Sequence, residues 1–295
     1  MTPARPVQTG LFLAGLALAA GLDRALAPGI AGQVVILAPA VALLGLPHGA
    51  LDLPMAEALW PLRRPADRVR FHAAYLGLAG GVALLWWLAP AAALAAFLAY
   101  SALHFAGDWE GDGRLAQAAG GISAIGAPAL FHTGEVAAIF ALLGPGEAAA
   151  PLARALAAAG GAGAGLAALS LVAAPRRGRH AGAEQAGIWL GAALLPPLLY
   201  FVAYFCLLHA LRHFAQTLAE LPDPARARRA AGAVTAVSIL GAAGAFAALH
   251  LSGGLAVQAA SLQVVFIGLA ALTVPHMLLV DRFRRQTPAD AVRAG

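Results

Sequence analysis

Long apolar runs separated by short polar breaks make up almost the whole chain. A run of roughly 17–25 apolar residues is long enough to cross the hydrocarbon core of a bilayer as a helix. Such runs fall at residues 9–27, 30–50, 71–89, 91–107, 115–143, 150–174, 184–216, 231–251 and 255–280. The pattern predicts an all-α fold: a polytopic integral membrane helical bundle in which residues 1–295 form a single transmembrane domain.

One run is ambiguous. The stretch 184–216 is too long for one crossing and contains Pro196 and Pro197, so it predicts either two helices or one kinked helix. Arginine-rich breaks lie at 63–70, 176–179, 226–229 and 282–285. If 184–216 crosses twice, all four lie on the side of the N-terminus and Arg5, which the positive-inside rule makes cytoplasmic. We therefore expect about eight to ten crossings, cytoplasmic N- and C-termini, and an inner (plasma) membrane location.

Composition agrees with the pattern. The chain is 61% hydrophobic and 11% charged, with a mean hydropathy of +0.77, whereas a soluble domain carries about 25% charged residues. The net charge of +5 comes from arginine alone, since the sequence has no lysine. These arginines lie in short breaks without polar surface around them, which favours the lipid bilayer and not nucleic acid as the partner. Cys206 has no second cysteine to pair with.

Five histidines interrupt the apolar runs at positions where a lipid-facing helix would carry leucine. They are His48, His104, His209, His213 and His276. Ionisable groups inside a membrane are costly and usually face the bundle interior, where they serve function. The motif HALRH places His209 and His213 one helical turn apart, a spacing able to chelate one metal ion.

Each histidine alone has a simpler explanation, because a membrane histidine often forms only an interhelical hydrogen bond. HxxxH alone is also a weak motif. The conjunction carries the hypothesis: three segments supply His48, His104 and the His209/His213 pair to one site, with no competing polar network. An all-imidazole site favours iron, copper or zinc over magnesium or calcium.

Two aspartates follow histidines by four residues, in HGALD and HFAGD. If the helix continues, Asp52 and Asp108 could accept a hydrogen bond that orients an imidazole or its neighbour. Glu57 is given a similar supporting or structural role. Aromatic residues such as Phe105 and Tyr204 flank the histidines; packing explains each singly, but together they suit a tunnel for an apolar substrate. Iron with dioxygen is the chemistry that attacks such molecules.

Four motifs carry a family resemblance. GLPHGALD, HFAGDW, LLHALRH and TVPHMLL, in order between Leu43 and Val280, resemble the Brp/Blh family of prokaryotic membrane carotene dioxygenases. The resemblance implies that O2 cleaves the central 15,15′ double bond of β-carotene, or of a related carotenoid, to give two retinal molecules. It also implies non-haem Fe(II) held by four histidines, which match His48, His104, His209 and His213 here.

The resemblance reaches two further histidines. His276 matches a family histidine that we place near the metal and not on it. His132, in PALFH, is expected either to line the substrate pocket or to make a loop hydrogen bond. Retinal made here would be available for hand-off to a rhodopsin.

Other functions fit the sequence less well. A membrane di-iron desaturase or hydroxylase needs about eight histidines in boxes such as HxxxH and HxxHH, and this chain has one HxxxH and no HxxHH. A histidine-lined metal transporter would need a polar, hydrated path. A retinal-binding rhodopsin needs a lysine for its Schiff base, and the chain has none.

Overall fold

The computed structural model describes residues 5–173 and 179–286, and within these ranges every regular element is helical and there is no strand. The all-α prediction is confirmed. The α-helices are α1 (Arg5–Leu26), α2 (Ile30–Ala40), α3 (Asp52–Leu59), α4 (Pro65–Leu88), α5 (Pro90–Ala106), α6 (Arg114–Phe131), α7 (Thr133–Leu142), α8 (Ala149–Ala173), α9 (Arg179–Leu194), α10 (Pro197–Phe201), α11 (Leu211–Glu220), α12 (Pro224–Ala247) and α13 (Val257–Gln286). Short π-helical segments are η1 (Val41–Gly45), η5 (Val202–Ala210) and η6 (Ala248–Ser252), and short 3-10 segments are η2 (Leu46–Leu51), η3 (Gly107–Trp109) and η4 (Gly146–Ala148).

Joined end to end, these elements give eight rods long and apolar enough to span a membrane in the described part of the chain. A ninth forms if α6 and α7, which meet at an angle of 103°, are one broken span. Both counts lie within the predicted range. The chain is therefore a polytopic membrane protein.

The ambiguous stretch 184–216 is two helices. α9 ends at Leu194 and a new helix starts at Pro197, because Pro196 has no amide hydrogen to continue the ladder and Pro197 occupies the first turn. With 16 residues, α9 extends roughly 24 Å, somewhat short of the hydrocarbon thickness of about 30 Å. A second crossing by α9 stays a prediction.

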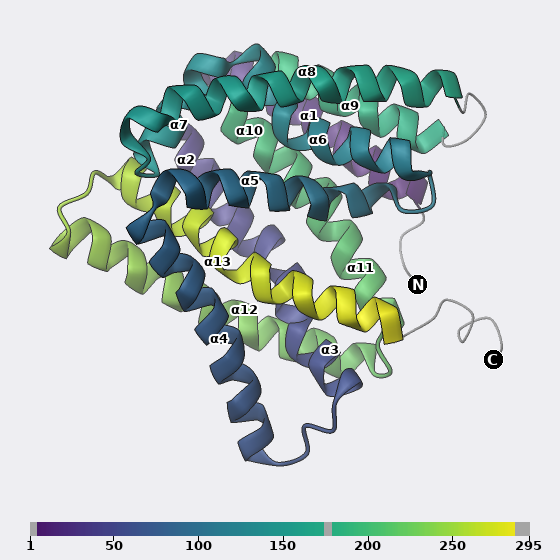
Figure 1. Cartoon of the computed structure of the whole chain (residues 1–295), viewed down its shortest axis with the longest axis vertical. Helices are drawn as coiled ribbons and strands as arrows, with labels where there is room; N and C mark the ends of the chain where they lie inside the picture. The colour runs from purple at the N-terminus through teal and green to yellow at the C-terminus, as the bar shows by residue number, and fades with distance from the viewer. Residues whose placement is uncertain (1–4, 174–178, 287–295) are drawn as a thin grey trace.

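The rod formed by α10, η5 and α11 is the centre of the molecule. It runs diagonally behind α5 and α13 in Figure 1, and 67% of its most apolar window is buried, against none of that of α12. Four polar side chains of this rod are buried: His209, Arg212, His213 and Thr217. It carries His209 and His213.

Close helix packing depends on glycine at two places. α6 and α8 lie side by side (Figure 1), and a Cβ on Gly126 would come within 2.6 Å of the backbone nitrogen of Gly160. In η1, a Cβ on Gly45 would meet the ring of Phe205 at 2.7 Å, so this glycine lets η1 lie against η5. η1 ends three residues before His48 and η5 contains His209. Such π-helical segments occur frequently at functional sites.

Candidate metal centre

The structure brings five histidine rings together from four separate rods; four are buried and His104 is half-buried. His48 lies on η2, His104 on α5, His209 on η5, His213 on α11 and His276 on α13. Neighbouring rings have centroids between 4.6 Å, for His104 and His209, and 6.1 Å, for His209 and His213. The four histidines selected from the sequence therefore converge, and His276 lies among them, 5.0 Å from the ring of His213.

The ring nitrogens have the spacing of ligands that share one ion. The Nε2 atoms of His104 and His209 are 3.1 Å apart. One ring nitrogen from each of His48, His104 and His276 lies within 4.8 Å of the other two. Transition metal to imidazole bonds of about 2.0–2.1 Å place neighbouring ligand atoms roughly 3 Å apart.

Hydrogen bonds at Nδ1 turn Nε2 toward the centre of the cluster. His276 Nδ1 donates to Asp52 Oδ1 at 2.7 Å, and His209 Nδ1 donates to both oxygens of Asp108 at 3.2 Å. His48 Nδ1 donates to the backbone carbonyl of Gly45. Fixing the proton on Nδ1 leaves Nε2 with a lone pair, which is how proteins prepare imidazole for metal binding. His276 Nε2 is buried, and none of the described residues forms a hydrogen bond with it; a metal ligand atom has these properties.

The two aspartates orient rings on other helices and not the histidine one turn before them. Asp52 follows His48 but binds His276, and Asp108 follows His104 but binds His209. The cause is local: residues 46–51 and 107–109 are 3-10 segments, in which residues four apart no longer share a face. Pro47 removes an amide donor at the first of these segments.

Each of the two carboxylates also accepts a hydrogen bond from a tyrosine hydroxyl. Tyr75 donates to Asp52 Oδ2 at 2.6 Å, and Tyr204 donates to Asp108 Oδ2 at 2.8 Å. Tyr204 was expected near the site and acts through this hydrogen bond. Tyr75 was missed, because in the sequence it is one aromatic residue in an ordinary lipid-facing pattern.

His213 and His132 differ in their relation to the cluster. The rings of His209 and His213 are nearly parallel, and His213 Nε2 lies 3.5 Å from the hydroxyl of Thr217. Chelation by the pair therefore stays a prediction. His132 lies at the bend between α6 and α7, with Nδ1 3.4 Å from Glu135, and lines neither cavity described below; this agrees with the loop interpretation.

Glu57 lies apart from the histidines. It forms ion pairs with Arg68 at 2.8 Å and Arg226 at 3.2 Å, which favours the structural role over the supporting one.

A buried ion pair behind the cluster was also missed. Arg212 lies between the two histidines of HALRH and is 2% exposed; its Nη2 donates to Glu184 Oε1 at 2.5 Å. Its Nη1 donates to the backbone carbonyl of Asp108 at 2.9 Å, and its Nε donates to Gln8 at 3.0 Å. The signal was a charge within an apolar run, which marks a functional or structural site with a partner.

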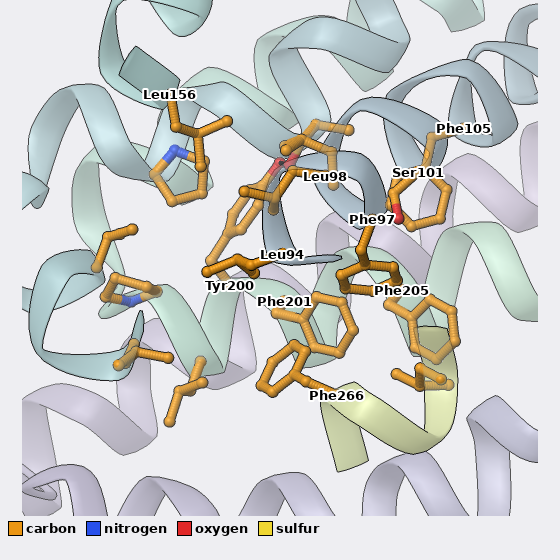
Figure 2. A pocket seen from close by; sticks show the side chains of 18 of the residues that line it. Leu94, Phe97, Leu98, Ser101, Phe105, Leu156, Tyr200, Phe201, Phe205 and Phe266 are labelled. Carbon is orange, nitrogen blue, oxygen red and sulfur yellow. Dashed lines mark hydrogen bonds between the residues drawn. The ribbon is translucent and has the colours of Figure 1, made fainter. Parts of the chain in front are cut away.

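An apolar cavity, which we call the inner cavity, lies within the bundle (Figure 2). His48 and His104 belong to its wall. Most of the remaining wall is aromatic or aliphatic and includes Phe97, Phe105, Phe201, Phe205 and Phe266, all labelled in Figure 2. Phe105 thus occupies the expected place, and the lining suits a long apolar ligand.

A second apolar cavity, which we call the outer cavity, lies between η2, α4, α12 and α13. His48 and His276 line it, as do Asp52 and Tyr75. The two cavities share the residues His48, Leu269 and Thr273. The histidine cluster therefore lies where two apolar spaces meet.

Fold and site together define a class: an integral membrane protein with a polyhistidine site suited to a transition metal and open to an apolar ligand. Residues 39–284, a range that contains all five histidines, match the family described as beta-carotene 15,15′-dioxygenase. A beta-carotene 15,15′-dioxygenase from uncultured marine bacterium 66A03 is 31% identical over 253 residues, covering 82% of this chain and 90% of the relative. The chain belongs to this family of carotenoid-cleaving oxidoreductases. No solved structure matches it.

Asp108→Asn and Asp52→Asn are expected to weaken metal binding by about 10- to 100-fold each, because an amide holds the imidazole Nδ1–H less firmly than a carboxylate. Iron titration of the metal-stripped protein in detergent measures the effect. Glu57→Gln is the matched control, since this carboxylate contacts only exposed arginines. Unchanged iron affinity in both aspartate variants would contradict the assigned roles.

Proposed function

We propose that this enzyme uses Fe(II) and O2 to cleave the central 15,15′ double bond of β-carotene, giving two retinal molecules. The observation that carries the proposal is the position of the imidazole cluster at the junction of the inner and outer cavities. A symmetric polyene centred at this junction has one apolar space for each half. Family membership supports the same reaction.

His48, His104, His209 and His213 would hold the iron, with His276 as a fifth imidazole directed at the same point. The donor set fits Fe(II), because neutral imidazoles bind it and leave it divalent. When bound, Fe(II) supplies coordination positions at which dioxygen can be activated. In the described residues, all carboxylates near the rings are already engaged by histidine and tyrosine, so no free acid or base faces the inner cavity.

The protein orients the imidazole rings, positions the substrate and excludes water from the inner cavity. Asp52 and Asp108 keep the rings in orientation through Nδ1. Phe201 and Phe205, stacked 5.0 Å apart, present flat apolar faces along the inner cavity. Such walls exclude water and restrict which double bond lies nearest the histidines, and holding reactants in a near-attack geometry accounts for a large part of catalysis.

The same structure supports an orientation in the inner (plasma) membrane with cytoplasmic termini. Arg5, at the start of α1, pairs with Asp112 at 2.6 Å, and Arg284, at the end of α13, pairs with Glu110 at 2.9 Å. Both described ends of the chain therefore meet the loop between α5 and α6. The positive-inside rule assigns this arginine-rich end to the cytoplasm. Retinal released into the bilayer would reach a rhodopsin by diffusion.

Expression in a β-carotene-producing bacterium tests the reaction. We expect the orange colour to fade and retinal to accumulate in membrane extracts analysed by chromatography, with a His209→Ala strain as the inactive control. Persistence of β-carotene and of hydroxylated carotenoids in cells supplied with iron and oxygen would contradict the proposal. Metal uptake by such cells would then favour the transporter.

A further inference from the structure

The outer cavity reaches the surface that faces lipid. Its mouth is flanked by Leu76 of α4 and Val237 of α12, which are 62% and 68% exposed and lie within apolar membrane-spanning helices. Its inner end is formed by His48 and His276. A continuous apolar space therefore connects the hydrocarbon region of the bilayer to the imidazole cluster.

The two helices at the mouth are free to leave this space open. Both α4 and α12 pack on α13, but in the described part of the chain they make no extensive contact with each other. None of the most apolar window of α12 is buried, and only 11% of that of α4. The gap between them is thus bounded by lipid-facing helices and not closed by a third one.

The inner cavity lies beyond the cluster from this mouth. Leu269 and Thr273, one turn apart on α13, line both cavities together with His48 and so form a neck between them. The wall changes character at this neck: the inner cavity is rich in phenylalanine, whereas the α12 side of the outer cavity is built from Ala233, Val234 and Val237.

We propose that the α4–α12 gap is a lateral portal through which a long isoprenoid polyene enters from the bilayer, one arm passing the neck into the inner cavity and the other staying in the outer cavity. The proposal rests on the proposed function and adds its substrate path. A hydrocarbon of this length is poorly soluble in water, so an entrance from lipid spares it exposure of its apolar surface. The occupant is an apolar chain and not a metal ion, because the mouth itself presents leucine and valine.

Matched tryptophan substitutions on α12 test the portal. Ala233 and Val237 line the outer cavity. Ala236 and Leu240 are also exposed on the same helix, but they line neither the outer cavity nor the neighbouring groove between α12 and α2. Ala233→Trp and Val237→Trp should slow retinal formation from β-carotene by roughly tenfold or more, because an indole ring overfills the passage. Ala236→Trp and Leu240→Trp should behave like the unaltered protein.

Two further measurements separate a blocked portal from a damaged protein. Iron content of each purified variant should be unchanged. Uptake of β-carotene from vesicles under anaerobic conditions, followed by its absorption spectrum, should be slower for the cavity-lining variants and unaltered for the controls. If Ala233→Trp fails to retain iron, the portal is judged from Val237→Trp, which lies at the mouth of the outer cavity.

The outcomes distinguish this inference from the reaction itself. Absence of retinal from the unaltered protein and from Ala236→Trp contradicts the proposed function. Retinal formed at equal rates by all four variants overturns the portal alone. Slowing by Ala243→Trp, in the neighbouring groove between α12 and α2, without slowing by Ala233→Trp, also overturns it and places the entrance there.

Discussion

Replacing His209 or His276 by alanine is expected to strip the enzyme of iron and to reduce retinal formation below detection. In each ring a carboxylate accepts a hydrogen bond from Nδ1, and Nε2 points into the cluster. Each change therefore removes a ligand atom whose orientation the carboxylate sets. The loss should exceed the about 10- to 100-fold effect expected when only the supporting aspartate is altered. Iron per protein and retinal per minute, measured on the same membranes, check it.

A matched histidine outside the site controls for nonspecific damage. His250, at the end of α12, bonds the carbonyl of Leu255 and lies in neither cavity described above, so His250→Ala should keep both iron and activity. Full activity in His209→Ala or His213→Ala would overturn the ligand assignment. Iron retained in His276→Ala would return this residue to a place beside the metal, where it acts on Asp52.

The convergence of the five histidines could be predicted from the sequence. Histidine is so costly against lipid that five of them in apolar runs had to turn inward, and inward positions on a few rods converge. The proline pair likewise allowed two helices across 184–216, and the arginine breaks favoured them over one kinked helix. These features depend on local chemistry and on the bilayer as solvent, both of which can be derived from a single sequence.

The partners of the two aspartates could not be predicted in this way. A four-residue spacing implies a shared face only where the helix is regular. HGALD lies almost wholly in the 3-10 segment η2, and HFAGD passes from α5 into the 3-10 segment η3. Which distant ring then receives the carboxylate depends on how α5, α13 and the central rod cross. The sequence also could not show that His276 is oriented by Asp52, a residue 224 positions away.

Glu184→Gln is expected to destabilise the fold by about 3–5 kcal/mol, because the Arg212 guanidinium stays buried without its ion-pair partner. Glu184→Gln should cost more than Arg212→Met. Without Glu184, the guanidinium keeps only neutral acceptors, Gln8 and the carbonyl of Asp108, whereas Glu184 without Arg212 still accepts from Thr9 at 2.6 Å and pairs with Arg5 at 3.2 Å.

Thermal unfolding in detergent measures these differences, and an exposed pair supplies the control. Arg226→Met and Glu57→Gln break an ion pair of 3.2 Å at the surface, where such pairs contribute about 0–1 kcal/mol. The double variant Arg212→Met, Glu184→Met should regain part of the lost stability, since neither charge is then left alone. It should still bind iron weakly, because the carbonyl of Asp108 loses its donor and the carboxylate on the same residue orients His209. Recovery of stability together with full iron affinity would show that the pair supports only the fold.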